Sequence, residues 1–92
     1  MRCYQRSHQF YCGIDLHARS MYLCIRDRDG NIVLHKNFPA QAATLLDAIA
    51  PFRQDLVVGC ECMFAWYWVA DLCAEQDLPF VLGHALDFKE LR

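Results

Sequence analysis

Two acidic residues each end an apolar segment of strand length, and their placement predicts a metal site. Asp15 ends the segment of residues 10–15, and Glu61 ends the segment of residues 56–61. If these segments are adjacent parallel strands, the two carboxylates meet at one edge of the sheet. Carboxylates within about 4–5 Å of each other repel unless a cation lies between them, and Mg²⁺ prefers oxygen ligands. The expected chemistry is therefore divalent-metal binding, which nucleases use to activate water for phosphodiester cleavage.

A glycine precedes each acid by two residues, at Gly13 and Gly59. Alternate residues share one face of a strand, so we expect the sheet below both carboxylates to be bare and accessible. A structural interpretation competes with the metal site, because Glu61 could cap the helix that follows it and Asp15 could cap a turn.

Basic residues near the first acid are weaker candidates for DNA or phosphate contacts. His17 stands two residues beyond Asp15, and Arg19 follows it. Arg26 and Arg28 lie near the second expected strand, and arginines contact phosphates readily. Ordinary turn chemistry for His17 and scattered surface charge for the arginines are the competing interpretations.

Composition places few limits on function. The 92 residues are 55% hydrophobic and carry a net charge of −2, which predicts one small domain without global attraction to nucleic acid. No apolar run approaches the ~18 residues of a membrane helix, so we expect no membrane partner. The first eight residues are too polar for a secretion signal, which makes the cytoplasm the expected location.

Six cysteines are present, and we expect reduced structural thiols rather than disulfides. Cys12, Cys24, Cys60 and Cys73 stand within apolar periodic segments, where cysteine behaves as a small hydrophobic residue. The chain has no C-x-x-C pair, and Cys60-x-Cys62 alone is a poor zinc signature. Zinc binding is the alternative.

The elements that would position the acids follow from apolar periodicity. Residues 1–9 read as a lead-in. Strands are expected at residues 10–15, 21–26 and 32–38, with Asp29-Gly30-Asn31 as a hairpin turn between the second and third. A further strand is expected at residues 55–61, and a short one at residues 79–82.

Two helices separate the later strands. The first is expected over residues 40–53 and should end at Pro51; its apolar stripe is Ala42, Leu45, Leu46 and Ile49. The second is expected over residues 64–76, with an inner stripe of Trp68, Val69, Leu72 and Cys73.

The order of these elements is β-β-β-α-β-α-β, which predicts an α/β domain over residues 10–92. Two hairpins give an antiparallel arrangement of the first three strands. A right-handed crossover then places the fourth strand beside the first. The resulting five-stranded mixed sheet has the order 3-2-1-4-5, which is the ribonuclease H-like topology, and it brings Asp15 next to Glu61.

Three motifs resemble the N-terminal domain of the DEDD insertion-sequence transposases, the RuvC-like group whose type element is IS-one-ten. The motifs are Gly13-Ile14-Asp15-Leu16-His17, Glu61-Cys62-Met63-Phe64-Ala65-Trp66-Tyr67-Trp68 and Pro79-Phe80-Val81-Leu82-Gly83-His84-Ala85. The match runs from about Tyr11 to Ala85, nearly the whole chain. The combination of motifs is specific, although G-x-D alone would be weak.

The resemblance implies a DNA transposase or recombinase that requires Mg²⁺ or Mn²⁺, with Asp15 and Glu61 as the first two acids of a catalytic and metal-binding tetrad. It also implies DNA and a structured guide RNA as partners of the full-length protein. The family's last two acids belong to a later Asp-x-x-Asp motif, whereas residues 86–92 depart from the pattern. We therefore expect a truncated domain, incomplete at its C-terminus and inactive alone.

Two other functions compete with this one. The chain could be a small interaction or regulatory remnant that forms homo-oligomers or binds full-length transposase, because the aromatic segment of residues 64–68 is too apolar all round to face only the core. It could also be half of an actin-like ATPase, which shares the strand order. That class needs small residues after the acid to cradle phosphate, and Leu16-His17 does not provide them.

Overall fold

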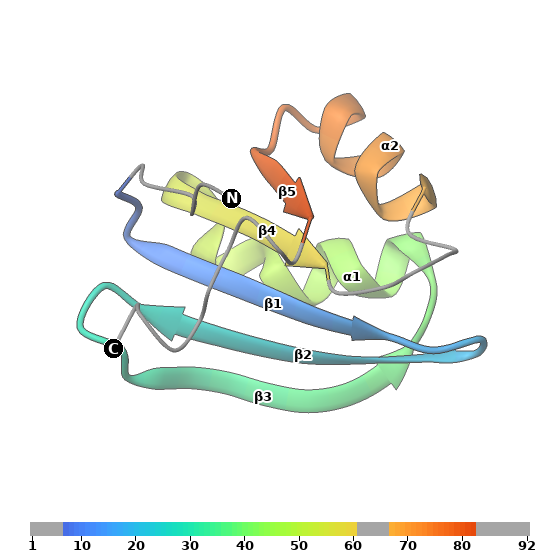
Figure 1. Cartoon of the computed structure of the whole chain (residues 1–92), viewed down its shortest axis with the longest axis horizontal. Helices are drawn as coiled ribbons and strands as arrows, with labels where there is room; N and C mark the ends of the chain where they lie inside the picture. Colours follow the sequence, from blue (N-terminus) through green and yellow to red (C-terminus); the bar gives the residue numbers. More distant parts are fainter. Residues whose placement is uncertain (1–6, 61–66, 83–92) are drawn as a thin grey trace.

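The computed structural model describes residues 7–60 and 67–82 of the 92-residue chain (Figure 1). Its elements are β1 (Phe10–Leu16), β2 (Ser20–Asp27), β3 (Ile32–Pro39), α1 (Ala42–Ile49), η1 (Ala50–Asp55), β4 (Leu56–Cys60), α2 (Tyr67–Glu75) and β5 (Phe80–Leu82). They follow the predicted order.

The five strands form one mixed sheet with the order β3-β2-β1-β4-β5. The pairs β1–β2 and β2–β3 are antiparallel, whereas β4 is parallel to both β1 and β5. This arrangement confirms the predicted α/β class and strand order. It places β1 at the centre of the sheet, where an antiparallel neighbour and a parallel neighbour meet.

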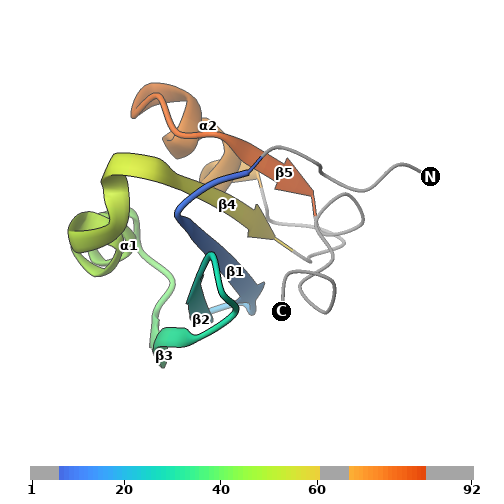
Figure 2. The same ribbon diagram turned by 90° about the vertical axis from the view of Figure 1, so that its left-hand side faces the viewer.

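Both helices cover the same face of the sheet (Figures 1 and 2). Apart from Lys36 on β3, which is opposite Leu23, the strand residues directed toward this face are apolar and alternate with residues of the opposite face, as the two-residue period of a strand requires. The buried core cluster on the helical face consists of Cys12, Ile14, Leu16, Met21, Leu23, Ile25, Leu45, Ile49, Leu56, Val58, Cys60, Val69 and Cys73. Neither described helix has the length and hydropathy needed to cross a bilayer.

The first helix is shorter than its apolar period predicts. α1 ends at Ile49, and the chain continues as the 3-10 helix η1 with Pro51 in its first turn. A proline is tolerated there because the amides of a first turn have no intrahelical partner. Leu45 and Ile49 are buried and Leu46 is half-buried, whereas Ala42, the first residue of the helix, is exposed, so the predicted stripe packs against the core from Leu45 onward.

The second helix ends in a Schellman motif. Leu78 N donates to Cys73 O over 2.8 Å, and Asp77 N donates to Ala74 O over 3.3 Å. These are the two hydrogen bonds that close this motif. The motif also requires a left-handed backbone at the first residue after the helix end. Asp77 supplies it with φ of 58°. The motif turns the chain back toward β5, where Leu78 packs against the core cluster.

The turn between β2 and β3 has the predicted chemistry. Gly30 adopts φ of 88°, which is favourable only for a residue without a side chain or for a few polar ones. The Asp27 carboxylate accepts from the amides of Asp29 and Asn31 over 3.0 and 2.9 Å. These hydrogen bonds lower the pKa of Asp27 below its ordinary value, with the Asn31 amide as the largest cause.

Candidate functional site

Asp15 occupies the position that the sequence predicts, near the C-terminal end of the central strand. Its neighbours Ile14 and Leu16 are buried in the core, whereas the Asp15 side chain is 63% exposed. The β1–β4 register pairs Ile14 with Cys60. Asp15 and Glu61 directly follow these two residues in the sequence; Glu61 lies outside the described residues. The backbone geometry up to this point is the one a carboxylate pair requires.

The two glycines are paired, but the surface near them is less open than predicted. Gly13 lies opposite Gly59 across the β1–β4 ladder. Gly13 is half-buried and Gly59 is buried. The expectation of a bare sheet is therefore wrong at Gly59, because the lack of a side chain does not guarantee solvent contact. The exposed part of the site begins at Asp15.

Of the weaker candidates, the described structure shows a contact with Asp15 for His17, whereas Arg28 donates to His8 O at the other end of β1. The His17 Nε2 atom lies 3.3 Å from Asp15 Oδ2, and the His17 side chain is 59% exposed. A contact of this kind between exposed groups contributes little to stability, so the Asp15 carboxylate stays free to exchange this partner for a cation. Arg19 is exposed and uses its carbonyl to accept from Ala40 N over 3.1 Å.

The described side chains supply only part of a metal site. Among residues 7–60 and 67–82, no group of three or more potential ligands is close enough to hold an ion. Asp15 offers carboxylate oxygens, which suit Mg²⁺ or Mn²⁺, and such ions retain several water ligands when one or two carboxylates bind them. Asp15 therefore fits one protein ligand of such a site, and the second carboxylate would come from Glu61.

A second polar pair lies on the same face as Asp15, and we did not predict it from the sequence. Tyr22 stands directly opposite Asp15 across the β1–β2 ladder. The Tyr22 hydroxyl lies 2.9 Å from His35 Nδ1 on β3. The two rings meet edge to face, with centroids 6.3 Å apart. Alternation along β2 and β3 was the signal that could have placed these side chains together.

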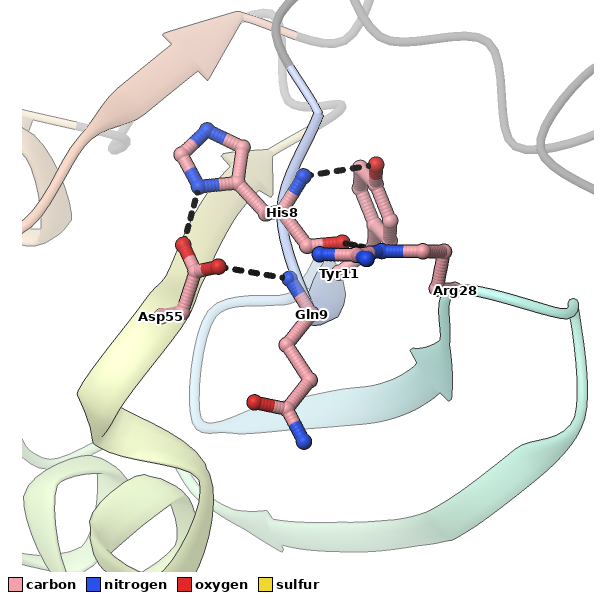
Figure 3. Close-up of polar contacts among 5 residues, drawn as sticks. All are labelled: His8, Gln9, Tyr11, Arg28 and Asp55. Atoms are coloured by element: carbon pink, nitrogen blue, oxygen red, sulfur yellow. Dashed lines mark hydrogen bonds and ion pairs between the residues drawn. The ribbon is translucent and has the colours of Figure 1, made fainter.

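A third polar cluster, at the opposite end of β1, joins His8 and Gln9 to Asp55 at the end of η1 (Figure 3). His8 is 5% exposed, and its Nδ1 lies 2.9 Å from Asp55 Oδ1. Gln9 N donates to the other Asp55 oxygen over 3.0 Å, and His8 N donates to the Tyr11 hydroxyl over 2.9 Å. The His8 hydrogen bond is the main cause of a lowered pKa at Asp55. These contacts join His8, Gln9 and Asp55 at the end of β1 away from Asp15, so we assign the cluster to positioning the strands.

The cysteines of the described chain are free thiols. Cys12, Cys60 and Cys73 are buried, and Cys24 is half-buried on the opposite face of the sheet. Burial raises the pKa of Cys73 to about 11 and raises that of Cys12 still further. Thiols of this kind are poor nucleophiles, which fits the predicted structural role. Cys62, which the zinc alternative requires, lies outside the described residues.

The comparisons with known proteins concern the fold. No protein-family model and no curated protein matches the sequence. A solved Bacteroides thetaiotaomicron protein with an actin-like ATPase fold and unknown function is similar in structure, with a TM-score of 0.65 and 10% identity. The similarity covers 90% of this chain and 36% of that chain, so this chain spans little more than a third of the other protein.

A second similar structure is the Argonaute of Marinitoga piezophila, solved in complex with a 5′-OH guide RNA. Its TM-score is 0.46 at 19% identity, over 85% of this chain and 16% of that chain. This likeness is too distant to carry an argument. The likeness to the Bacteroides protein shows the α/β fold and leaves the activity to be argued from the residues.

Proposed function

We propose that this chain is the N-terminal part of a ribonuclease H-like catalytic domain that cleaves DNA with the help of a divalent cation. The observation that carries the proposal is the exposed Asp15 carboxylate on the central strand, one residue beyond the Ile14–Cys60 pair of the β1–β4 register. The motif resemblance to RuvC-like transposases supports DNA as the substrate and a guide RNA as a partner of the full-length protein.

In this proposal Asp15 and Glu61 hold Mg²⁺ or Mn²⁺. A bound ion would lower the pKa of a coordinated water and neutralise charge on the phosphate. The His17 ring lies 3.3 Å from the Asp15 carboxylate and is the contact that the ion would replace. The 92 residues hold two of the four acids that the resemblance implies, so we expect metal binding without DNA cleavage by this chain alone.

Manganese titration followed by electron paramagnetic resonance tests the proposal. We expect weak Mn²⁺ binding that Mg²⁺ displaces and that disappears in Asp15→Asn and in Glu61→Gln. Asp71→Asn is the matched control, because Asp71 is an exposed acid on α2, away from the site. Tight binding that survives Asp15→Asn would overturn the proposal.

A nucleotide-binding function is the second candidate, because the similar Bacteroides structure has an actin-like ATPase fold. Phosphate binding in the β1–β2 turn would need free backbone amides and small residues. His17 N instead donates to Ser20 O over 2.8 Å and closes the turn. We therefore expect no ATP binding in the presence of Mg²⁺. Binding of ATP with micromolar affinity that is lost when Ser20 is substituted would favour this second function.

An interaction function remains the alternative to catalysis. Tyr67 at the start of α2 is 64% exposed, and Ile32 and Val33 on β3 are the other large exposed hydrophobic residues described. An adaptor built on these residues would self-associate or capture a larger partner. Sedimentation velocity separates the possibilities: a concentration-dependent dimer that Tyr67→Ser or Val33→Ser disrupts supports the interaction function.

A further inference from the structure

The strand face that carries Asp15 continues across β2 and β3 as a polar surface. Tyr22 is opposite Asp15 on one side and opposite Asn37 on the other, and Cys24 is opposite His35. Residues directly opposite each other in a ladder share one face. His35 and Asn37 are exposed and Tyr22 is half-buried. Both described helices lie on the other face (Figure 2), so this hydrogen-bonded aromatic pair is not part of the core between the sheet and the helices.

The Tyr22–His35 pair is preorganised to contact a ligand. Its two rings have each other as their only hydrogen-bond partners among the described residues. When the Tyr22 hydroxyl donates to His35 Nδ1, the imidazole carries its proton on Nε2 and can donate it outward. The phenol ring therefore offers a nucleotide base a flat surface on which to stack. The fixed N–H group can donate a hydrogen bond to a phosphate oxygen.

The segment that contains β2 and β3 has more cationic than acidic side chains, which favours an anionic ligand there. Residues 17–39, which contain β2 and β3, carry four cationic side chains and two acids. The cationic residues are Arg19, Arg26, Arg28 and Lys36. Arg26 shares a face of β2 with Tyr22, whereas Lys36 is opposite Leu23 and lies on the helical face. One of the two acids, Asp27, is already engaged by the amides of its own turn. Residues 40–60 and 67–82, which contain both helices, instead carry five acids and one arginine.

We propose that Tyr22 and His35 form a contact site for one nucleotide of a single-stranded nucleic acid whose backbone crosses β2 and β3 toward Asp15. This inference rests on the proposed function, because Asp15 marks the direction in which the strand continues. Stacking on an aromatic side chain is worth about 1–3 kcal/mol per base, and a hydrogen bond to a charged group about 1.5–3 kcal/mol, so removing either ring should weaken binding about 5- to 150-fold.

Fluorescence anisotropy with a labelled oligothymidine of roughly ten nucleotides tests the site. The titration is done in EDTA with the complete chain, so that it does not depend on metal binding. We expect Tyr22→Ala and His35→Ala to weaken binding by the stated factor, and Tyr22→Phe to have a smaller effect because it keeps the ring. Tyr67→Ala is the matched control, since it removes an exposed tyrosine from the helical layer.

Several outcomes would overturn the inference. Absence of oligonucleotide binding would show that no nucleotide binds at this pair. A larger loss of affinity in Tyr67→Ala than in Tyr22→Ala would show the same. Equal loss of binding to a labelled polyglutamate peptide would mean a general anion or protein site. Near-ultraviolet circular dichroism verifies that each variant is folded. The same titration with a labelled oligouridine distinguishes RNA from DNA. Tighter binding of either probe that depends on Tyr22 and His35 supports the site.

The two proposals fail separately. Loss of Mn²⁺ binding is expected in Asp15→Asn and not in Tyr22→Ala or His35→Ala. A chain that binds oligonucleotide through Tyr22 and His35 but binds no Mn²⁺ would refute the metal function and leave the contact site. The opposite result would retain the metal function and refute the contact site.

Discussion

Replacing Leu45 by alanine would test whether the helical face of the sheet is one cooperative core that shields its cysteines. Leu45 is 1% exposed and belongs to the same buried cluster as Cys12, Cys60 and Cys73. A buried Leu→Ala change removes transfer free energy and leaves a cavity, at a cost of about 2–4 kcal/mol. If the three thiols become reactive only on unfolding, their labelling should accelerate about 30- to 900-fold.

The expected slow labelling of the parent protein has two causes. Burial raises the pKa of Cys73 from 9.0 to about 11, which lowers its reactive thiolate fraction near pH 8 about 100-fold. Access to the core adds a further barrier, because the labelling reagent cannot reach a buried sulfur. Cys24 lies on the other face and is half-buried, so it provides the internal reference for rapid labelling.

The assay is N-ethylmaleimide labelling followed by peptide mass spectrometry, in a background where Cys3 and Cys62 are replaced by serine. Leu46→Ala is the matched control, because the neighbouring leucine is only half-buried and should cost less. The reasoning is refuted if Cys73 is labelled as fast as Cys24 in the parent protein. It is also refuted if Leu45→Ala lowers the unfolding midpoint while the labelling rates of the buried cysteines stay unchanged.

Three further predictions concern the polar contacts and the turns. The lowered pKa of Asp55, whose ordinary value is 3.8, contributes stability that is complete above that pH and is lost as the pH falls through the folded value. Asp55→Asn should therefore flatten this part of the acid-unfolding profile measured by circular dichroism, and an unchanged slope would contradict the His8 contact as its cause. Gly30→Ala should lower the free energy of unfolding by about 1–2 kcal/mol, because φ of 88° is unfavourable for alanine; urea titration measures it, and Gly30→Asn should cost less. Asp77→Gly should raise the free energy of unfolding by up to about 1 kcal/mol, since φ of 58° suits glycine, and a lower urea midpoint would argue against this helix end.

Much of the fold could be predicted because its signals are local. The alternation in residues 10–15 and the glycine of the Asp29-Gly30-Asn31 turn act within a few residues, and the right-handed crossover rule then leaves one position for the fourth strand. The position of Asp15 followed from this strand order. Helix length was harder, since Pro51 is compatible with the start of a 3-10 turn as well as with the end of an α-helix.

The contacts that were missed join residues far apart in sequence. His8 and Asp55 are separated by 47 positions, and no spacing rule connects a lead-in histidine to an acid before the fourth strand. Tyr22 and His35 required the exact β2–β3 register, which depends on an irregularity between Ile25 and Arg26. The burial of Gly59 depends on what covers it, which its own strand pattern does not encode.

The topology has a consequence for how the chain assembles during synthesis. β1, β2 and β3 are consecutive and joined by short turns, whereas β4 must pair with β1 between Leu56 and Phe10. Nearby segments meet faster than distant ones because closing a short loop costs less entropy. The three-stranded meander can therefore form as it leaves the ribosome, with β1 as an edge strand that β4 pairs with later. A substitution that weakens the Gly30 turn should slow folding, whereas one in β4 should mainly accelerate unfolding.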